Sequence, residues 1–269
     1  MGKYWRYNVS YSSWSQISPP IGKEHWHCDR QRGYKRARKK EPGIKELVNV
    51  DNTAQNIGHL AQRGVYEFHQ DVKLLFSPDG VQRVAEILKL SQESTEVRER
   101  VEAILKNYSQ EPILLGRNII ELQKGDEGFP KAIPIKYRNL TFALYAAFDC
   151  VLLEPDNAIH ILDFKTGKSD FDLRQAYVYL LAAEHLYPNH QAIASFYNLE
   201  TQVASEPRSA SSPAIESMRI ELSEAAKKLQ QDTQRYRQNP HLFDRIFPAN
   251  PGSSCKYCAF NSVCEYAAS

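Results

Sequence analysis

The clearest hydrophobic pattern in the chain lies between Thr141 and Tyr179. Two segments rich in apolar, β-branched and aromatic residues, TFALYAAFDCVLL and AIHILDF, flank a turn-forming Pro-Asp-Asn sequence at 155–157. This pattern predicts two antiparallel strands joined by a tight turn. A helix is predicted directly afterwards, and either Asp170 or Asp172 can cap its first turn.

The predicted hairpin brings acidic and basic side chains together. If residues 155–157 form a three-residue loop, Asp149 lies opposite Asp163 on the same face of the sheet. A loop one residue shorter would break this register. Because side chains alternate along a strand, Lys165 shares the face of Asp163, and Phe164 points to the other face.

Two carboxylates at this separation repel each other unless a positive charge lies between them. Hard oxygen ligands of this kind suit Mg²⁺ or Mn²⁺, which can neutralise charge developing on a phosphodiester. An alternative is an ordinary Asp–Lys surface pair on a half-exposed hairpin. The apolar flanks favour the metal site, as does the following helix, which carries Gln175 and Tyr179 on one face.

The combination of these motifs resembles the PD-(D/E)XK nucleases of the RecB type. The resemblance implies an α/β, restriction-endonuclease-like fold, with a mixed sheet flanked by helices. It implies a Mg²⁺- or Mn²⁺-dependent deoxyribonuclease acting on DNA ends or single strands. In that family the two acids bind the metal, the lysine is catalytic, and the Q-x-x-x-Y helix supports the site and contacts DNA. We expect the Phe164 carbonyl to assist the acids in binding the metal. The corresponding residues here are Asp149, Asp163, Phe164, Lys165, Gln175 and Tyr179.

The segment IGHLAQ at 57–62 resembles the first motif of the family, G-x-x-x-H, with Gln62 in place of the histidine. A glutamine oxygen can contact a hard cation directly or through water. His59, Glu67 and His69 are nearby alternatives. This departure keeps a second function open, in which the protein is a catalytically inactive DNA-end-binding or assembly subunit.

The overall charge is too small to attract nucleic acid by itself. The chain has 269 residues, 42% of them hydrophobic and 25% charged, and a net charge of +2. Such a composition predicts a soluble globular protein, so DNA binding needs a local basic patch. The run RQRGYKRARKK at 30–40 provides one, although a solvated helical face explains such a run equally well. The candidate DNA-binding residues are Arg30, Arg32, Lys35, Arg36, Arg38 and Lys39.

Three of the five cysteines form a C-x-x-C-x-x-x-x-x-C motif near the C-terminus, at Cys255, Cys258 and Cys264. Cys28 is the predicted fourth ligand, because Cys150 lies within a predicted strand and is interpreted as a core residue. The spacing is compatible with zinc or with an iron–sulfur cluster.

This arrangement resembles the clasp of RecB-type nucleases that carry a four-iron four-sulfur (4Fe-4S) cluster, such as CRISPR-adaptation exonucleases and the nuclease domains of helicase–nuclease complexes. The resemblance implies a 4Fe-4S cluster that joins the two ends of the chain, with zinc as the alternative. It is compatible with CRISPR adaptation, DNA repair or phage-related processing, with a helicase or recombination partner. A third function class is a redox or zinc module in which the acidic motif is only structural.

The remaining segments predict a supporting framework. Residues 77–110 form a helical insertion, AIASFYNLE at 192–200 forms a strand, and residues 213–239 form a long amphipathic helix. We expect a single domain over residues 1–269, with the tail 248–269 pairing with Cys28. No apolar run approaches the roughly 18 residues that span a bilayer, and no signal peptide is evident, which predicts a cytoplasmic protein with no membrane partner.

Overall fold

The computed structural model describes residues 5–48, 53–125, 128, 130–167 and 171–267. The chain divides into two compact units. The terminal unit comprises residues 1–50, 132–145 and 216–269 and so contains both chain ends, and the central unit comprises residues 51–131 and 146–215.

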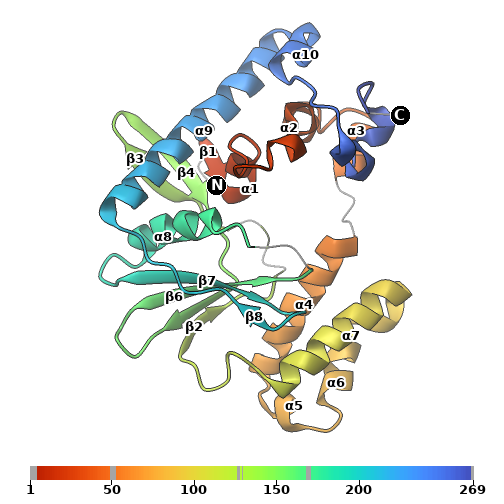
Figure 1. Cartoon of the computed structure of the whole chain (residues 1–269), viewed down its shortest axis with the longest axis vertical. Coiled ribbons are helices and arrows are strands. Elements are labelled where there is room, and N and C mark those ends of the chain that lie inside the picture. The colour runs from red at the N-terminus through yellow and green to blue at the C-terminus, as the bar shows by residue number, and fades with distance from the viewer. Residues whose placement is uncertain (1–4, 49–52, 126–127, 129, 168–170, 268–269) are drawn as a thin grey trace. The chain divides into compact units, whose positions relative to one another are not determined.

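The central unit is built on a mixed sheet with strand order β2-β5-β6-β7-β8 (Figure 1). The strands are β2 Ile119–Leu122, β5 Cys150–Leu153, β6 Ile159–Lys165, β7 Ala192–Asn198 and β8 Val203–Ala204. Neighbouring strands pair antiparallel except β6 and β7, which run parallel because helix α8 connects them. The helices are α4 Thr53–Gln70, α5 Lys73–Phe76, α6 Gly80–Ile87, α7 Thr95–Gln110 and α8 Arg174–Leu186, with a short 3₁₀ turn, η2, at Leu90–Gln92.

One face of the central sheet packs against helices α4 to α7 and forms the main core. Phe164 and Cys150 from the sheet lie in one cluster with Val65 of α4 and with Val101 and Leu105 of α7. The helices predicted over 77–110 are therefore α6 and α7, and they contribute to this core.

The terminal unit contains a smaller mixed sheet with strand order β1-β4-β3. Its strands are β1 Asn8–Ser10, β3 Ile133–Tyr137 and β4 Leu140–Tyr145. Its α-helices are α1 Tyr11–Ser15, α2 Asp29–Arg36, α3 Ile44–Val48, α10 Phe243–Ile246 and all but the first residues of α9 Ser212–Gln238. Its 3₁₀ turns are η1 Glu24–Trp26, η3 Pro240–Leu242, η4 Ser253–Tyr257 and η5 Asn261–Val263.

The fold class predicted from sequence is confirmed, since the two mixed sheets flanked by helices are consistent with a restriction-endonuclease-like fold. The expectation of one sheet is wrong. The segment TFALYAAFDCVLL forms two strands, because β4 ends at Tyr145 and β5 begins at Cys150 in the other sheet. The break spans residues 146–149, between strands that pair with different partners in different sheets. None of the helices in the described ranges is long and apolar enough to cross a membrane.

Candidate active site and cysteine cavity

The register predicted for the β5–β6 hairpin is confirmed. Cys150 pairs with Leu162, and the backbone N–H of Glu154 donates to the carbonyl of Ala158 at 2.9 Å, which leaves residues 155–157 as the loop. Asn157 has a φ of 67°, the left-handed conformation that asparagine tolerates in turns. Continuing the pairing by one residue places Asp149 opposite Asp163.

Asp163 lies within β6 and is only 4% exposed. Its Oδ1 accepts hydrogen bonds from the Tyr179 hydroxyl and from Gln175 Nε2, the latter at 3.2 Å. Its Oδ2 lies 2.5 Å from Lys165 Nζ. That contact is an ion pair without hydrogen-bond geometry, so Oδ2 is a buried acceptor with no hydrogen bond from the residues that the structure describes. A buried acceptor oxygen that receives no hydrogen bond is unfavourable unless a cation satisfies it.

Helix α8 supports this carboxylate. Gln175 and Tyr179 lie one turn apart, and their polar groups contact each other as well as Asp163. Gln175 Oε1 also accepts a hydrogen bond from Lys165 Nζ at 3.1 Å. Burial, followed by the charges of Asp163 and Asp149, raises the pKa of Tyr179 well above its ordinary value, so the hydroxyl keeps its proton and donates it. The Q-x-x-x-Y motif therefore fixes both the acid and the lysine.

Asp149 is held against the strand that carries Asp163. Its Oδ2 accepts a hydrogen bond from the backbone N–H of Phe164 at 2.7 Å. Burial and then the neighbouring Asp163 carboxylate raise the pKa of Asp149 well above its ordinary value, against the opposing effects of the Phe164 N–H, Lys165 and a hydrogen bond from Gln62. The pair therefore favours holding a proton unless another positive charge joins it.

These side chains open on a cavity of about 360 Å³ in the central unit, which we call the carboxylate site. Gln62 and His59 of α4 line it together with Asp149, Asp163 and Lys165. A Cβ at Gly125 would lie 3.2 Å from Gln62 Oε1, and Gly125 has a φ of +91°, so this position favours glycine for both reasons.

Two of the alternatives to Gln62 have other partners. His69 Nε2 lies 2.7 Å from the Tyr108 hydroxyl, and Glu67 lies 3.7 Å from Arg63 Nε. Neither residue is among those that line the carboxylate site. Within the described ranges, no group of three or more His, Cys, Asp or Glu side chains is arranged to hold a metal ion. The donors that line the carboxylate site are therefore the two carboxylates, neutral oxygens and the His59 ring.

The other two acids considered from sequence lie near the start of α8. Asp170 lies outside the described residues, whereas Asp172 Oδ1 accepts a hydrogen bond from the Arg174 backbone N–H at 3.1 Å.

The terminal unit brings four cysteines around one cavity of about 150 Å³, which we call the cysteine cavity. They are Cys28, Cys255, Cys258 and Cys264. Burial, and then the neighbouring thiols, raise the pKa of Cys258, while the backbone N–H of Phe260 opposes this shift. Cys150 lies elsewhere, fully buried in β5 of the central unit. The structure thus groups the four cysteines that the sequence predicted and leaves out the fifth.

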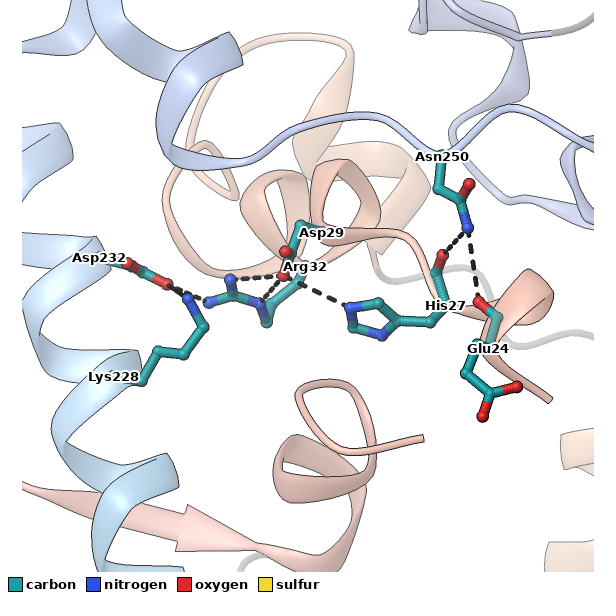
Figure 2. Close-up of polar contacts among 7 residues, drawn as sticks. All are labelled: Glu24, His27, Asp29, Arg32, Lys228, Asp232 and Asn250. Atoms are coloured by element: carbon teal, nitrogen blue, oxygen red, sulfur yellow. Dashed lines mark hydrogen bonds and ion pairs between the residues drawn. The ribbon is translucent and has the colours of Figure 1, made fainter. Parts of the chain in front are cut away.

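Several contacts join the two chain ends around this cavity. The Arg30 backbone N–H donates to the carbonyl of Pro248 at 3.1 Å. Asn250 Nδ2 donates to the carbonyl of His27 at 2.8 Å, as Figure 2 shows. Gly33 of α2 allows a close approach to the C-terminal segment, since a Cβ there would lie 2.6 Å from the Phe247 ring. The predicted joining of the ends is therefore present in the fold.

A buried ion network stabilises the same segment (Figure 2). Arg32 is 1% exposed and donates to Asp29 Oδ1 at 2.5 and 2.8 Å and to Asp232 Oδ2 at 2.8 Å. Lys228 Nζ lies 3.2 Å from Asp232, and His27 Nε2 lies 3.7 Å from Asp29. The network ties the helix that follows Cys28 to α9.

The basic run at 30–40 is divided between the interior and the surface. Arg30 is 3% exposed, pairs with Asp244 and lies against the Phe243 and Tyr266 rings. Contrary to the expectation from sequence, Arg30 and Arg32 thus present no exposed guanidinium to DNA. Arg36 is partly buried and donates to Asn8 Oδ1 at 3.2 Å, and desolvation lowers its pKa. The remaining predicted residues differ in exposure: Arg38 is partly exposed, and Lys35 and Lys39 are exposed.

Sequence reasoning missed three residues at the cysteine cavity. Trp26 and Tyr257 line it and are 52% and 72% exposed, and Lys256 Nζ lies 4.8 Å from the Tyr257 ring centroid. Lys256 and Tyr257 are the two residues inside the C-x-x-C motif, so the motif itself was the available signal.

A model of the PD-(D/E)XK nuclease superfamily matches residues 29–265. The chain therefore belongs to the PD-(D/E)XK nuclease superfamily, and this membership implies phosphodiester-cleaving nuclease activity. No curated protein matches the chain. One solved structure, titled "Crystal structure of SSO0001", is similar over 89% of this chain and 96% of that chain, at 12% identity and a TM-score of 0.31. At that score the likeness carries no argument.

Proposed function

We propose that the protein is a divalent-metal-dependent deoxyribonuclease and that the carboxylate site is its active site. The observation that carries this proposal is the pair of carboxylates Asp149 and Asp163 beside Lys165, of which Asp163 is buried. The pair leaves the buried Asp163 Oδ2 without a hydrogen bond from the described residues. Two neighbouring carboxylates beside one lysine are short of positive charge, which is the condition that a cation relieves.

Asp149, Asp163, the Phe164 carbonyl and the Gln62 amide oxygen would hold Mg²⁺ or Mn²⁺. All four offer hard oxygen donors, and the two aspartates among them carry the negative charge. When bound, such a cation supplies neutralising charge at the phosphate and acidifies water. The role of Gln62 rests on its place in the cavity and on its hydrogen bond to Asp149.

Lys165 would stabilise negative charge that develops on the scissile phosphate. Its ammonium group forms an ion pair with Asp163 at 2.5 Å and donates a hydrogen bond to Gln175 Oε1 at 3.1 Å, and its side chain is 34% exposed. An ammonium group has three N–H donors, so further donors remain for a substrate. Gln175 and Tyr179 act as positioning residues through Asp163 and Lys165.

DNA ends or single strands would be the substrate, with an exonuclease-like mode of cleavage. Lys35, Lys39 and the partly exposed Arg38 supply cations for the phosphate backbone. The five cysteines without a disulfide fit a reducing, cytoplasmic setting. A helicase, recombination or CRISPR-adaptation protein would deliver the DNA.

The cysteine cavity would hold a 4Fe-4S cluster. Four thiols around one cavity form the donor set of such a cluster. A single zinc ion held by the same four thiolates is the alternative.

Cleavage of end-labelled DNA tests the active-site assignment. Single-stranded and duplex DNA are incubated with Mn²⁺, Mg²⁺ or EDTA, and wild type is compared with Lys165→Ala. Lys131→Ala is the matched control, because Lys131 is an exposed lysine of the same unit that does not line the carboxylate site. We expect metal-dependent cleavage that falls by about 10²- to 10³-fold in Lys165→Ala only. DNA binding without cleavage in every metal would instead indicate an inactive DNA-end-binding subunit.

Iron and sulfide analysis of anaerobically purified protein tests the cluster. Cys258→Ala should lose bound iron and sulfide, whereas Cys150→Ala should retain both, because Cys150 lies outside the cavity. Zinc in place of iron, or iron retained in Cys258→Ala, would contradict the cluster assignment.

A further inference from the structure

Two exposed aromatic rings lie at the cysteine cavity. The ring centroids of Trp26 and Tyr257 are 6.4 Å apart, with 27° between the ring planes. Trp26 ends the turn η1, Tyr257 ends the turn η4, and both residues line the cavity. We call these two residues the aromatic pair.

The exposure of this pair contrasts with a buried aromatic cluster of the same unit. Tyr34, Phe243, Phe247 and Phe260 form a buried cluster in which each ring is at most 5% exposed. The aromatic pair contributes no such burial, although burial is what normally makes aromatic residues stabilising. Two near-parallel rings with exposed faces are instead typical of surfaces that stack on unpaired nucleobases.

Cationic and polar groups border the aromatic pair. Lys256 Nζ lies 4.8 Å from the Tyr257 ring centroid, and the His25 ring lies 5.5 Å from the Trp26 ring. Lys23 is exposed at the start of the same turn as Trp26, and Glu24 is the acid beside it. Lysines beside exposed rings match the two parts of single-stranded DNA, its phosphates and its bases.

We propose that Trp26 and Tyr257 bind an unpaired base of single-stranded DNA by stacking, with Lys256 contacting the adjacent phosphate. This inference rests on the proposed function, in which DNA is the substrate, and adds a place where a single strand is held. Stacking uses the flat face that every base has, so the site accepts any base sequence. Duplex DNA does not offer these faces, and its binding should not depend on the aromatic pair.

Equilibrium binding of a fluorescein-labelled oligo(dT) to the full chain tests the proposal. EDTA is present, so that cleavage does not interfere. Tyr257→Ala and Trp26→Ala should each weaken binding by about tenfold or more, whereas Tyr257→Phe and Trp26→Phe should stay near wild type. Phe76→Ala is the matched control, because Phe76 is a 71% exposed aromatic residue of the central unit. A duplex of the same length should bind all variants equally.

The salt dependence separates stacking from charge. Removing a ring should leave the slope of log affinity against log salt unchanged, because no counterion is released by stacking. Removing the Lys256 charge should lower the slope by about one. Bound oligo(dT) should also quench Trp fluorescence in wild type, and Trp26→Phe should lose this quenching while it keeps its affinity.

Two outcomes would overturn the proposal. The first is a Tyr257→Ala variant that binds oligo(dT) as tightly as wild type. The second is that the ring variants lose oligo(dT) binding only when they also lose cysteine-bound iron. That result would show that the two rings cover the cavity and do not bind DNA. Because binding is measured without cleavage, a protein that stacks oligo(dT) but never cuts DNA would contradict the proposed function alone. A protein that cuts DNA but binds normally as Tyr257→Ala would contradict this inference alone.

Discussion

The carboxylate site and the cysteine cavity are built in opposite ways. The first takes its acids and lysine from one hairpin, and α8 follows within the same short stretch of sequence. The second joins residues from the two ends of the chain, such as Cys28 and Cys258. Local strand register therefore fixes the first site, whereas long-range closure of the chain fixes the second.

The two regions also handle buried charge differently. At the carboxylate site, two acids share one lysine, and an acceptor oxygen is left without a hydrogen bond from the described residues. Beside the cysteine cavity, the buried Arg32 has two acids as partners. A buried charge that its neighbours compensate incompletely indicates a ligand-binding site. A buried charge that is fully compensated indicates a structural role. Mutations that remove charge should therefore have opposite effects on stability in the two regions.

The largest expected effect is that of Asp163→Asn on activity. It should reduce metal-dependent cleavage by at least about 10³-fold, or about 4 kcal/mol, because a cation ligand is lost. The thermal unfolding midpoint should rise, because the repulsion between the Asp163 and Asp149 carboxylates disappears. Cleavage rates and thermal unfolding measure the two effects. Asp156→Asn, in the exposed turn, is the control and should change neither. A lower midpoint in Asp163→Asn would show that the acid pair is not destabilising.

The next effect is that of Arg32→Met on stability. This change leaves Asp29 and Asp232 with fewer partners and should lower the free energy of unfolding by about 3 kcal/mol. Urea denaturation of the full chain measures it. Lys35→Met is the matched control on the same helix, because Lys35 is exposed. Equal stability of the two variants would show that the ion network does not hold the terminal unit together.

A smaller effect on stability is expected when the pH is lowered, through the carboxylate of Asp29. Burial disfavours the charge of Asp29, but hydrogen bonds from His27 and Arg32 and their charges outweigh it and lower its pKa to about 2. Because the folded pKa lies below the unfolded value of about 3.9, this stabilisation is complete above pH 4 and is lost as the pH falls toward 2. It amounts to about 2 kcal/mol. Urea denaturation between pH 5 and pH 2 should show a shallower loss of stability in Asp29→Asn, and identical slopes would contradict the assignment.

The smallest effect is expected at Gly125. Gly125→Ala and Gly116→Ala each place a side chain at a positive φ, +91° and +75°, and should each lower stability by about 1 kcal/mol. Only the Gly125 Cβ would contact Gln62, since nothing lies within 4 Å of a Cβ at Gly116. Cleavage assays should therefore show reduced activity in Gly125→Ala alone. Equal activity in the two variants would argue against a role for Gln62.

The sequence by itself determined the carboxylate site, because strand periodicity and a three-residue turn are local properties. They placed Asp149, Asp163 and Lys165 on one face and Phe164 in the core, and the structure has that arrangement. The C-x-x-C spacing likewise identified the three C-terminal cysteines that line the cavity. These features needed no knowledge of how distant segments meet.

Only the tertiary structure decided which charges in the run 30–40 are exposed. Arg30 and Lys35 are indistinguishable as members of a basic segment, yet Asp244 and the rings of Phe243 and Tyr266 enclose Arg30 while Lys35 stays in solvent. Those partners lie more than 200 residues further along the chain. The break between β4 and β5 had the same origin, since strand propensity does not record that neighbouring segments join different sheets. Burial and sheet membership depend on partners that are distant in sequence, and so they appear only when the chain has folded.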